Sequence, residues 1–455
     1  MTGKNRDQTL AMGTEPIAGL MIRFSLPAIV GMLANALYNI VDRIFVGQAV
    51  GPEAIGAISV AFPYMLFVFS CGLLVGVGSG ALVSISLGEG RRSRAERAMG
   101  NALLFLAAGS AVLTCGGLSF PHAILRLSGA SASMLPSAEE YFRIVAWGIP
   151  FSTLSFGLNF FIRSEGAPWY AMFTLVIGAF SNIILDWFLI ISMKMGISGA
   201  AWATVASQIL SSLWAVRYYL LGRGSLRLRK RHLFPDRIVL GRILSVGFAP
   251  FLTELSFTVI MALFNRILGK YGGDMAISAM GIFFSLDSLF FLPVLGLAGG
   301  VQPIIGYNYG SGNFSRVMKA VTTALWMSAV YFAASFSIIM AIPVPLVKIF
   351  NSSSAQLVSL AARALRIAYS GVIFASVSVI AAHAFQAMGK AKVGIFLTLS
   401  RHFLFILVPL FLLPPLLGTD GVWMALPLSD LGGGILGAWL LKREFRILGG
   451  KIMEG

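Results

Sequence analysis

The sequence is poor in charged residues, and above all in acidic ones. Of its 455 residues, 18 are Asp or Glu and 34 are Lys or Arg, so charged side chains make up only 11% of the chain. Hydrophobic residues make up 57%. A water-soluble protein of this length cannot hide so much apolar surface, because a large part of any folded chain stays exposed. This composition excludes a soluble globular fold and predicts a membrane protein.

Sequence signatures of enzymes and nucleotide-driven pumps are also missing. The chain has no phosphate-binding Walker loop, no His-Glu-x-x-His metal motif and no Gly-x-Ser-x-Gly nucleophile elbow. We therefore expect no enzymatic activity and no cofactor beyond a coupling ion, H⁺ or Na⁺. Segments of alternating polarity are absent as well, which excludes a transmembrane β-barrel.

Long charge-free runs are the main positive feature of the chain. A helix needs about 20 apolar residues to cross a bilayer. Six runs reach or approach that length: Ala54–Leu87, Ala98–Leu125, Ile144–Ile162, Met195–Val216, Ala320–Val347 and Ile367–Gly389. With the segments interrupted by a single acid or a terminal Arg, the pattern predicts an all-α integral membrane protein with twelve transmembrane helices.

The net charge of +16 has a topological explanation. If the N-terminus lies in the cytoplasm, most Lys and Arg residues fall in the predicted cytoplasmic tails and loops. This bias is the positive-inside rule, and it predicts that both termini are cytoplasmic. Contact with anionic membrane lipids accounts for the basic residues, so we expect no nucleic-acid partner.

The two halves of the chain resemble each other at an offset of 222 residues. Ser86–Ala98 aligns with Asn308–Ala320, with both glycines and the Ser-Arg pair in common. We predict two six-helix lobes, at 1–222 and 242–455, and a basic cytoplasmic linker at 223–241. An even number of spans gives both lobes the same orientation, so they form a parallel repeat, and in transporters this places the substrate between two lobes. The alternative is a duplication with a structural role alone.

Glycines recur every four residues on two predicted helices. Gly72, Gly76 and Gly80 lie on the second helix, and Gly296 and Gly300 lie on the eighth. Small residues at this spacing let two helix backbones approach closely. We interpret both faces as surfaces for lobe packing.

Four acidic residues lie inside apolar stretches, on four different predicted helices: Asp42, Asp186, Glu254 and Asp287. An ionisable side chain at membrane depth is energetically costly, so each is a candidate functional residue. Two of the four lie in each half of the chain. This distribution predicts a polar cavity in a transporter.

The first helix carries a polar face that ends in an acid. Asn35, Tyr38, Asn39 and Asp42 are spaced so that they share one side of the helix. Lipid cannot hydrogen-bond these groups, so this face is expected to look inward, toward substrate or ion. A local ion pair between Asp42 and the adjacent Arg43 is the alternative.

The fifth and sixth helices supply further oxygen-bearing side chains. Asn182 and Asp186 lie one turn apart on the fifth helix, and Thr204 lies on the sixth. Together with Asp42 they predict a small cage for a proton or for Na⁺, because hard cations prefer carboxylate, carbonyl and amide oxygens. Hydrogen bonding between helices is the alternative role for Asn182 and Asp186.

The acids of the second half have apolar neighbours on the same helix face. Met280 and Phe283 precede Asp287 by seven and four residues, and Glu254 lies on the preceding helix. Carboxylates beside aromatic and Met side chains suit an organic cation through charge pairing and cation–π attraction. We therefore predict that these four residues bind substrate, with simple core packing as the alternative for Met280 and Phe283.

These features together resemble the MATE (multidrug and toxic compound extrusion) family, and most closely its DinF-like prokaryotic branch. The resemblance covers almost the whole chain. It rests on the duplicated six-helix unit and on a set of local matches: the Pro27-to-Asp42 first helix, the Asn182/Asp186 pair, Glu254 and the stretch Gln302–Gly310.

The resemblance implies a V-shaped inner-membrane antiporter that exports organic cations in exchange for H⁺ or Na⁺. The amino-lobe cation site of the branch corresponds to Asp42, Asn182, Asp186 and Thr204, and its helix-seven acid corresponds to Glu254. Na⁺ is the metal ion expected at Asp42, Asn182 and Asp186 if the protein is sodium-coupled.

Helix ten is where this sequence departs from the family. Some relatives carry a further acid there, whereas Ile367–Gly389 contains none, and Asp287 is a candidate substitute. His383 and Gln386 near the end of that helix are candidate members of a proton path. A single His in such a position is more often a packing residue.

The sequence thus predicts a secondary active multidrug exporter that works by alternating access as a monomer, with small organic cations and membrane lipids as partners. The alternative is a flippase for lipids or lipid-linked oligosaccharides from the same superfamily. A flippase is expected to line its cavity with cationic residues for a pyrophosphate group. The candidate residues here are acidic, which favours the exporter.

Overall fold

The computed structural model describes residues 10–49, 52–128, 130, 134–227, 232, 234–349 and 355–453. Within these residues the chain is almost entirely helical and contains no strand. The first half contains α2 (Ile17–Ala49), α3 (Pro52–Gly88), α4 (Arg92–Ser119), α5 (Pro121–Leu127), α6 (Leu135–Ala146), α7 (Ile149–Ser164), α8 (Pro168–Asp186), the π-helix η1 (Trp187–Ser192) and α9 (Gly196–Leu220).

The second half begins with α10, and several of its spans are assembled from shorter pieces. Its elements are α10 (Arg237–Gly310), α11 (Phe314–Ala341), α12 (Pro343–Lys348), α13 (Ala355–Ala368), the 3₁₀ turn η3 (Tyr369–Gly371), α14 (Val372–Ala387), α15 (Ala391–Leu399), the π-helix η4 (Ser400–Ile406), α16 (Leu407–Leu412), α17 (Pro414–Leu417) and α18 (Thr419–Met453). The long α10 is kinked at Gly273, whose φ of 65° is open to glycine at little cost, so α10 provides two spans.

The spans agree with the expected fold class. Ten helical segments of the described chain are long and apolar enough to cross a bilayer, and the pair α6–α7, bent by 49°, makes an eleventh. α9, a further helix of 25 residues, packs beside α7 and α8, so the predicted count of twelve is compatible with the described chain. The predicted all-α membrane fold is therefore confirmed.

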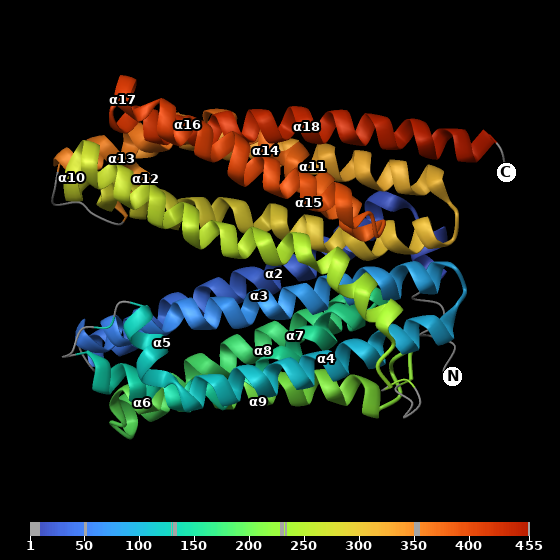
Figure 1. The fold of residues 1–455 in the computed structure, drawn as a ribbon, viewed down its shortest axis with the longest axis horizontal. Helices are drawn as coiled ribbons and strands as arrows, with labels where there is room; N and C mark the ends of the chain where they lie inside the picture. The colour runs from blue at the N-terminus through green and yellow to red at the C-terminus, as the bar shows by residue number, and fades with distance from the viewer. Residues whose placement is uncertain are drawn as a thin grey trace.

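The helices form two lobes. Figure 1 shows α2–α9 in one bundle and the elements from α10 onward in the other, with the two bundles close together at the end that carries both chain termini. Toward the opposite end the bundles move apart. The residue boundaries predicted for the two lobes and the linker stay a prediction.

Two glycines bring α3 of the first lobe against α10 of the second. A Cβ added to Gly247 would lie 1.7 Å from the carbonyl oxygen of Leu74, and one added to Gly78 would lie 2.0 Å from that of Ile243. Both obstacles are backbone atoms, so no side-chain rotation can relieve the clash. Only glycine permits this helix contact.

A second pair of glycines closes the same interface in a symmetric way. A Cβ on Gly88 would lie 1.9 Å from the carbonyl oxygen of Tyr307, and one on Gly310 would lie 2.0 Å from that of Ile85. Residues 85 and 88 become 307 and 310 at the repeat offset of 222, so each contact maps onto the other. Such a reciprocal contact is expected where a parallel repeat crosses its own symmetry axis.

The predicted glycine faces divide into two groups. Gly296 and Gly300 contact Ile29 and Ser25 of α2, so these glycines pack between the lobes. Gly72, Gly76 and Gly80 face Phe156 and Phe160 of α7, so these glycines pack within their own lobe. A four-residue glycine spacing shows that a neighbour is close, but not which helix it belongs to.

The chain that connects the lobes is anchored to the first lobe by buried acids. Glu165, at the end of α7, accepts hydrogen bonds from the Tyr219 hydroxyl, from the backbone and side chain of Ser225, and from the backbone of Leu226 at 3.1 Å. Glu96 of α4 accepts one from the backbone of Arg227 at 3.1 Å. These contacts hold the start of the linker in place.

We expect the stabilisation from Glu165 to decline as the pH rises from about 4.5 to about 7. Burial raises the pKa of Glu165 from its ordinary value of 4.5 to about 7, although four hydrogen-bond donors oppose the shift. A carboxyl group with a raised pKa stabilises the fold fully below its unfolded pKa, and this stabilisation is lost as the pH rises through the folded pKa. The loss should amount to on the order of 3 kcal/mol.

Glu165→Gln tests this expectation because the amide stays neutral. The thermal midpoint of the wild-type protein should fall relative to that of E165Q between about pH 4.5 and pH 7, and then run parallel to it. A constant difference across this range would show that Glu165 keeps the same charge in the folded and unfolded protein.

Candidate functional site

A cavity of about 600 Å³ lies between the two lobes. Its walls come from α2, α3, α7 and α8 on one side and from α10, α14, η4 and neighbouring elements on the other. Most lining side chains are apolar or aromatic. Five carry a formal charge: Arg163, Glu254, Asp287, Arg401 and Asp430. Apolar walls with a few placed polar groups are typical of small-molecule sites, and the volume lies in the usual range for them.

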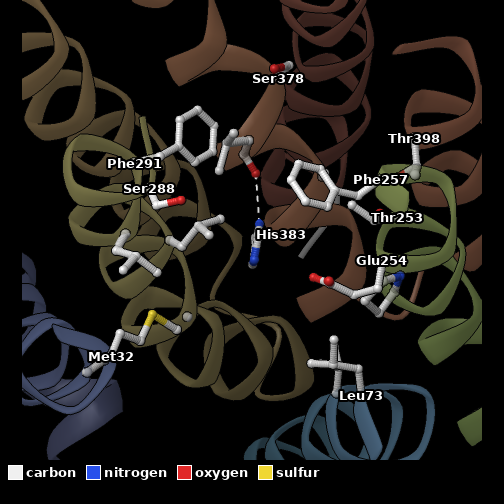
Figure 2. A pocket seen from close by; sticks show the side chains of 18 of the residues that line it. Met32, Leu73, Thr253, Glu254, Phe257, Ser288, Phe291, Ser378, His383 and Thr398 are labelled. Carbon is white, nitrogen blue, oxygen red and sulfur yellow. Dashed lines mark hydrogen bonds between the residues drawn. The ribbon is translucent and has the colours of Figure 1, made fainter. Parts of the chain in front are cut away.

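Glu254 and His383 face each other across part of this cavity. Figure 2 shows both side chains directed into the same space, with Thr253 and Phe257 close to the carboxylate. The Nδ1–H group of His383 donates to the backbone carbonyl of Val379 at 2.9 Å. Because a carbonyl only accepts, this bond fixes the neutral tautomer and leaves Nε2 to accept a proton or a hydrogen bond. Gln386, also predicted, lines the cavity as well.

Asp287 is held by an aromatic neighbour on another helix. The Tyr369 hydroxyl donates to Oδ1 of Asp287 at 3.0 Å, and the Phe283 ring packs edge-on against the Tyr369 ring at 5.9 Å. Tyr369 opens the 3₁₀ turn η3, which interrupts the helical span between α13 and α14. Phe283 and Asp287 therefore line the cavity as predicted, whereas Met280 is fully buried in the core of the second lobe, away from the cavity lining.

The structure adds a third cavity acid that sequence reasoning missed. Asp430 of α18 lines the cavity and accepts a hydrogen bond from Nη2 of Arg401 on η4 at 3.1 Å. Asp430 is the single charged residue in the apolar stretch Gly421–Leu441. Asp287 was selected because it is an acid inside an apolar stretch, and Asp430 meets the same criterion.

The predicted residues of the first lobe also come together. Asp42 of α2 lies beside Asp186 of α8, and both are close to Tyr141 of α6, whose hydroxyl is hydrogen-bonded to Thr204 of α9. The exposed fractions of Asp42 and Asp186 are 9% and 0%. Tyr141 was not predicted, because a Tyr in an apolar segment carries no distinctive signal.

We call this group the amino-lobe cage (Asp42, Tyr141, Asn182, Asp186 and Thr204). Some of its polar atoms are buried without a hydrogen-bond partner among the described residues. Both amide atoms of Asn182 are buried and have no hydrogen-bond partner in the described part of the chain, and the carboxyl group of Asp186 lies within hydrogen-bond reach of Asp42. Buried polar groups are normally paired, so the donor set fits a shared proton or a small hard cation.

The cage and the cavity are separate. None of the five cage residues lines the cavity. Tyr38 lies near Tyr141, whereas the side chains of Asn35, Asn39 and Arg43 lie outside the described residues, so the predicted polar face of α2 is tested only in part. No group of three or more His, Cys, Asp or Glu residues that would suit a metal ion occurs among the described residues.

Two helical lobes around a central cavity with buried carboxylates define a multi-pass membrane transporter. The MatE family model matches the chain twice, at residues 27–188 and 250–411. The protein belongs to the MatE family, which confirms the resemblance found in the sequence. Its assignment to the DinF-like branch stays a prediction.

Named relatives span nearly the whole chain. The multidrug export protein MepA of Staphylococcus aureus (strain NCTC 8325 / PS 47) is 27% identical over 446 residues, which cover 97% of this chain and 98% of the relative. MepA of Staphylococcus haemolyticus (strain JCSC1435) is 28% identical over 413 residues, or 90% of each protein.

Solved structures share the fold. A crystal structure of MATE in complex with MaL6 superimposes with a TM-score of 0.92 at 24% identity, and it covers 97% of this chain and 99% of its own. An outward-facing conformation of a multidrug resistance MATE family transporter of the MOP superfamily has a TM-score of 0.91 at 24% identity, with coverage of 97% and 98%.

Proposed function

We propose that this protein is a secondary active multidrug exporter, which exchanges organic cations for H⁺ or Na⁺ in the inner membrane of a prokaryote. Both termini are cytoplasmic in this proposal. The observation that carries it is the separation of buried carboxylates into two sites: an oxygen-rich cage in one lobe, and acids in an aromatic cavity between the lobes. The MepA relatives support the proposal as multidrug export proteins.

The cavity is suited to an amphipathic organic cation. Glu254 and Asp287 supply negative charge, and Phe257, Phe283 and Phe291 supply ring faces for apolar contact and cation–π attraction. Walls of this kind tolerate substrates of different shape, because apolar contact has little directional demand. This tolerance is what export of several drugs requires.

The amino-lobe cage supplies the coupling ion site in this proposal. Asp42 and Asp186 are like charges held close together in a poorly hydrated space, which is costly unless a proton or Na⁺ compensates them. Binding and release of that ion bias the two lobe arrangements differently, and this difference is what drives alternating access. The glycine contacts between α3 and α10 close the end of the molecule that carries the termini.

The flippase alternative is less well supported by the cavity lining. Two arginines line the cavity, but Arg401 is paired with Asp430, and three carboxylates share the same space. A pyrophosphate would meet excess negative charge there. The exporter remains the better explanation.

Glu254→Gln and Asp287→Asn should weaken binding of cationic substrates far more than that of neutral ones, because only cations lose a charge pair. The loss should be on the order of 1–3 kcal/mol per substitution. Binding of ethidium and of an uncharged apolar dye to the purified protein measures both effects. Glu139→Gln, at the partly exposed ion pair with Arg143 outside the cavity, is the matched control. Equal losses for both dyes would assign the two acids a structural role.

A further inference from the structure

The ion pair between Arg401 and Asp430 is the feature of the cavity that ion coupling and cation binding do not yet explain. Nη2 of Arg401 lies 3.1 Å from Oδ1 of Asp430, and the two side chains are 23% and 13% exposed. Both residues line the cavity beside Asp287. The pair therefore faces the space that the substrate would occupy.

The ion pair connects two separate helical elements, η4 and α18. Arg401 lies on η4, a π-helical segment inside a membrane span, and such segments are frequent at functional sites. Its backbone carbonyl accepts a hydrogen bond from the Ser429 hydroxyl of α18 at 3.2 Å. The guanidinium carbon lies 5.9 Å from the Phe291 ring centroid. These contacts aim the guanidinium at Asp430.

Asp430 is the acid that pairs with the Arg401 guanidinium in the described part of the chain. One hydrogen bond to Asp430 is formed, and Nε is buried without a hydrogen-bond partner in the described part of the chain. Arg offers five donors in a rigid fork and keeps its charge at any physiological pH. A cation that competes for Asp430 would have to displace this guanidinium and leave it without a counter-ion, which is costly at this depth.

The formal charge of the cavity depends on this pair. Three carboxylates (Glu254, Asp287 and Asp430) and two guanidiniums (Arg163 and Arg401) line it, together with His383 and His402. With the acids ionised and both histidines neutral, one negative charge remains, which matches a substrate with one positive charge. Without Arg401, two negative charges would remain.

We propose that Arg401 is a built-in counter-cation of Asp430, and that this ion pair sets the number of positive charges a substrate can carry. The pair disfavours dications because Arg401 occupies the carboxylate that a second positive charge needs. This inference rests on the proposed export of organic cations and names the residues that determine substrate charge.

Ethidium and propidium test the inference, because they share one ring system and carry one and two positive charges. Binding of each dye to the purified full-length protein is measured by fluorescence anisotropy. Arg401→Gln should raise the affinity for propidium relative to ethidium at least tenfold, which corresponds to about 1.4 kcal/mol. Asp430→Asn leaves Arg401 without its counter-ion and should change the ratio in the opposite direction. The double variant R401Q/D430N restores the net charge and should return the ratio to near the wild-type value.

Two further variants separate charge from shape and position. Arg401→Lys keeps the charge and should keep the wild-type ratio. Arg363→Gln removes an exposed cation from the ion pair with Asp420 outside the cavity, and should leave the ratio unchanged. If R401Q does not fold, D430N and the double variant still carry the comparison, because their expected shifts differ.

The outcomes distinguish this inference from the proposed function. Unchanged dye ratios in R401Q and D430N, with ethidium still bound, would overturn the role of the pair and leave the exporter proposal intact. Failure of the wild-type protein to bind either dye would count against the exporter itself.

Discussion

Asp42→Asn and Asp186→Asn are each expected to reduce active efflux to the background level while the protein stays folded and inserted. Both residues belong to the amino-lobe cage, where their carboxylates lie side by side and almost fully buried. Asparagine has nearly the same shape as aspartate but carries no charge. Either substitution therefore removes the negative charge that retains a proton or Na⁺, without leaving a cavity in the packing.

Efflux of ethidium from energised cells or vesicles measures this effect, with membrane yield and thermal midpoint as checks on folding. Tyr141→Phe provides a graded comparison, since it removes only the hydroxyl that bonds Thr204 and should slow efflux without abolishing it. Wild-type rates in either Asp variant would falsify the coupling role of the cage. In liposomes, efflux driven by a sodium gradient at constant pH would assign the cage to Na⁺ rather than to H⁺.

The sequence predicted the cage better than the cavity, for a physical reason. Asp42, Asn182 and Asp186 are polar at membrane depth, where almost any polar group must face another polar group or an ion. Their meeting in space follows from that constraint alone. Tyr141 escaped notice because its ring is compatible with an apolar helix and its hydroxyl leaves no pattern.

Helix periodicity was less informative in the second half. Met280, Phe283 and Asp287 share one broad helix face. One edge of this face contacts the cavity, and the other edge packs into the core of the lobe. Phe283 and Asp287 lie at the cavity, whereas Met280 packs entirely within the lobe. Which edge of a face is exposed to a cavity depends on the neighbouring helices, and a single sequence does not contain their positions.

Gly247→Ala is expected to reduce efflux at least tenfold by preventing closure at the end that carries the termini. Its new Cβ would lie 1.7 Å from the Leu74 carbonyl oxygen, far inside van der Waals contact, so α3 and α10 must separate. Alternating access needs both lobe arrangements to be reachable, and a shift that strongly favours one of them stops the cycle. The substitution adds a single methyl group to a helix, where Ala is otherwise preferred over Gly.

Matched controls lie on the same helix. Gly241 and Gly281 of α10 have no atom within 4 Å of an added Cβ, so Gly241→Ala and Gly281→Ala should keep wild-type efflux. Spin labels at the exposed residues Leu220 of α9 and Ile447 of α18, one on each lobe, report the separation by double electron–electron resonance. We expect a longer mean distance in G247A than in G281A, because only the former adds a group between the lobes. Equal distances together with normal efflux in G247A would show that the glycine contacts are not the closing interface.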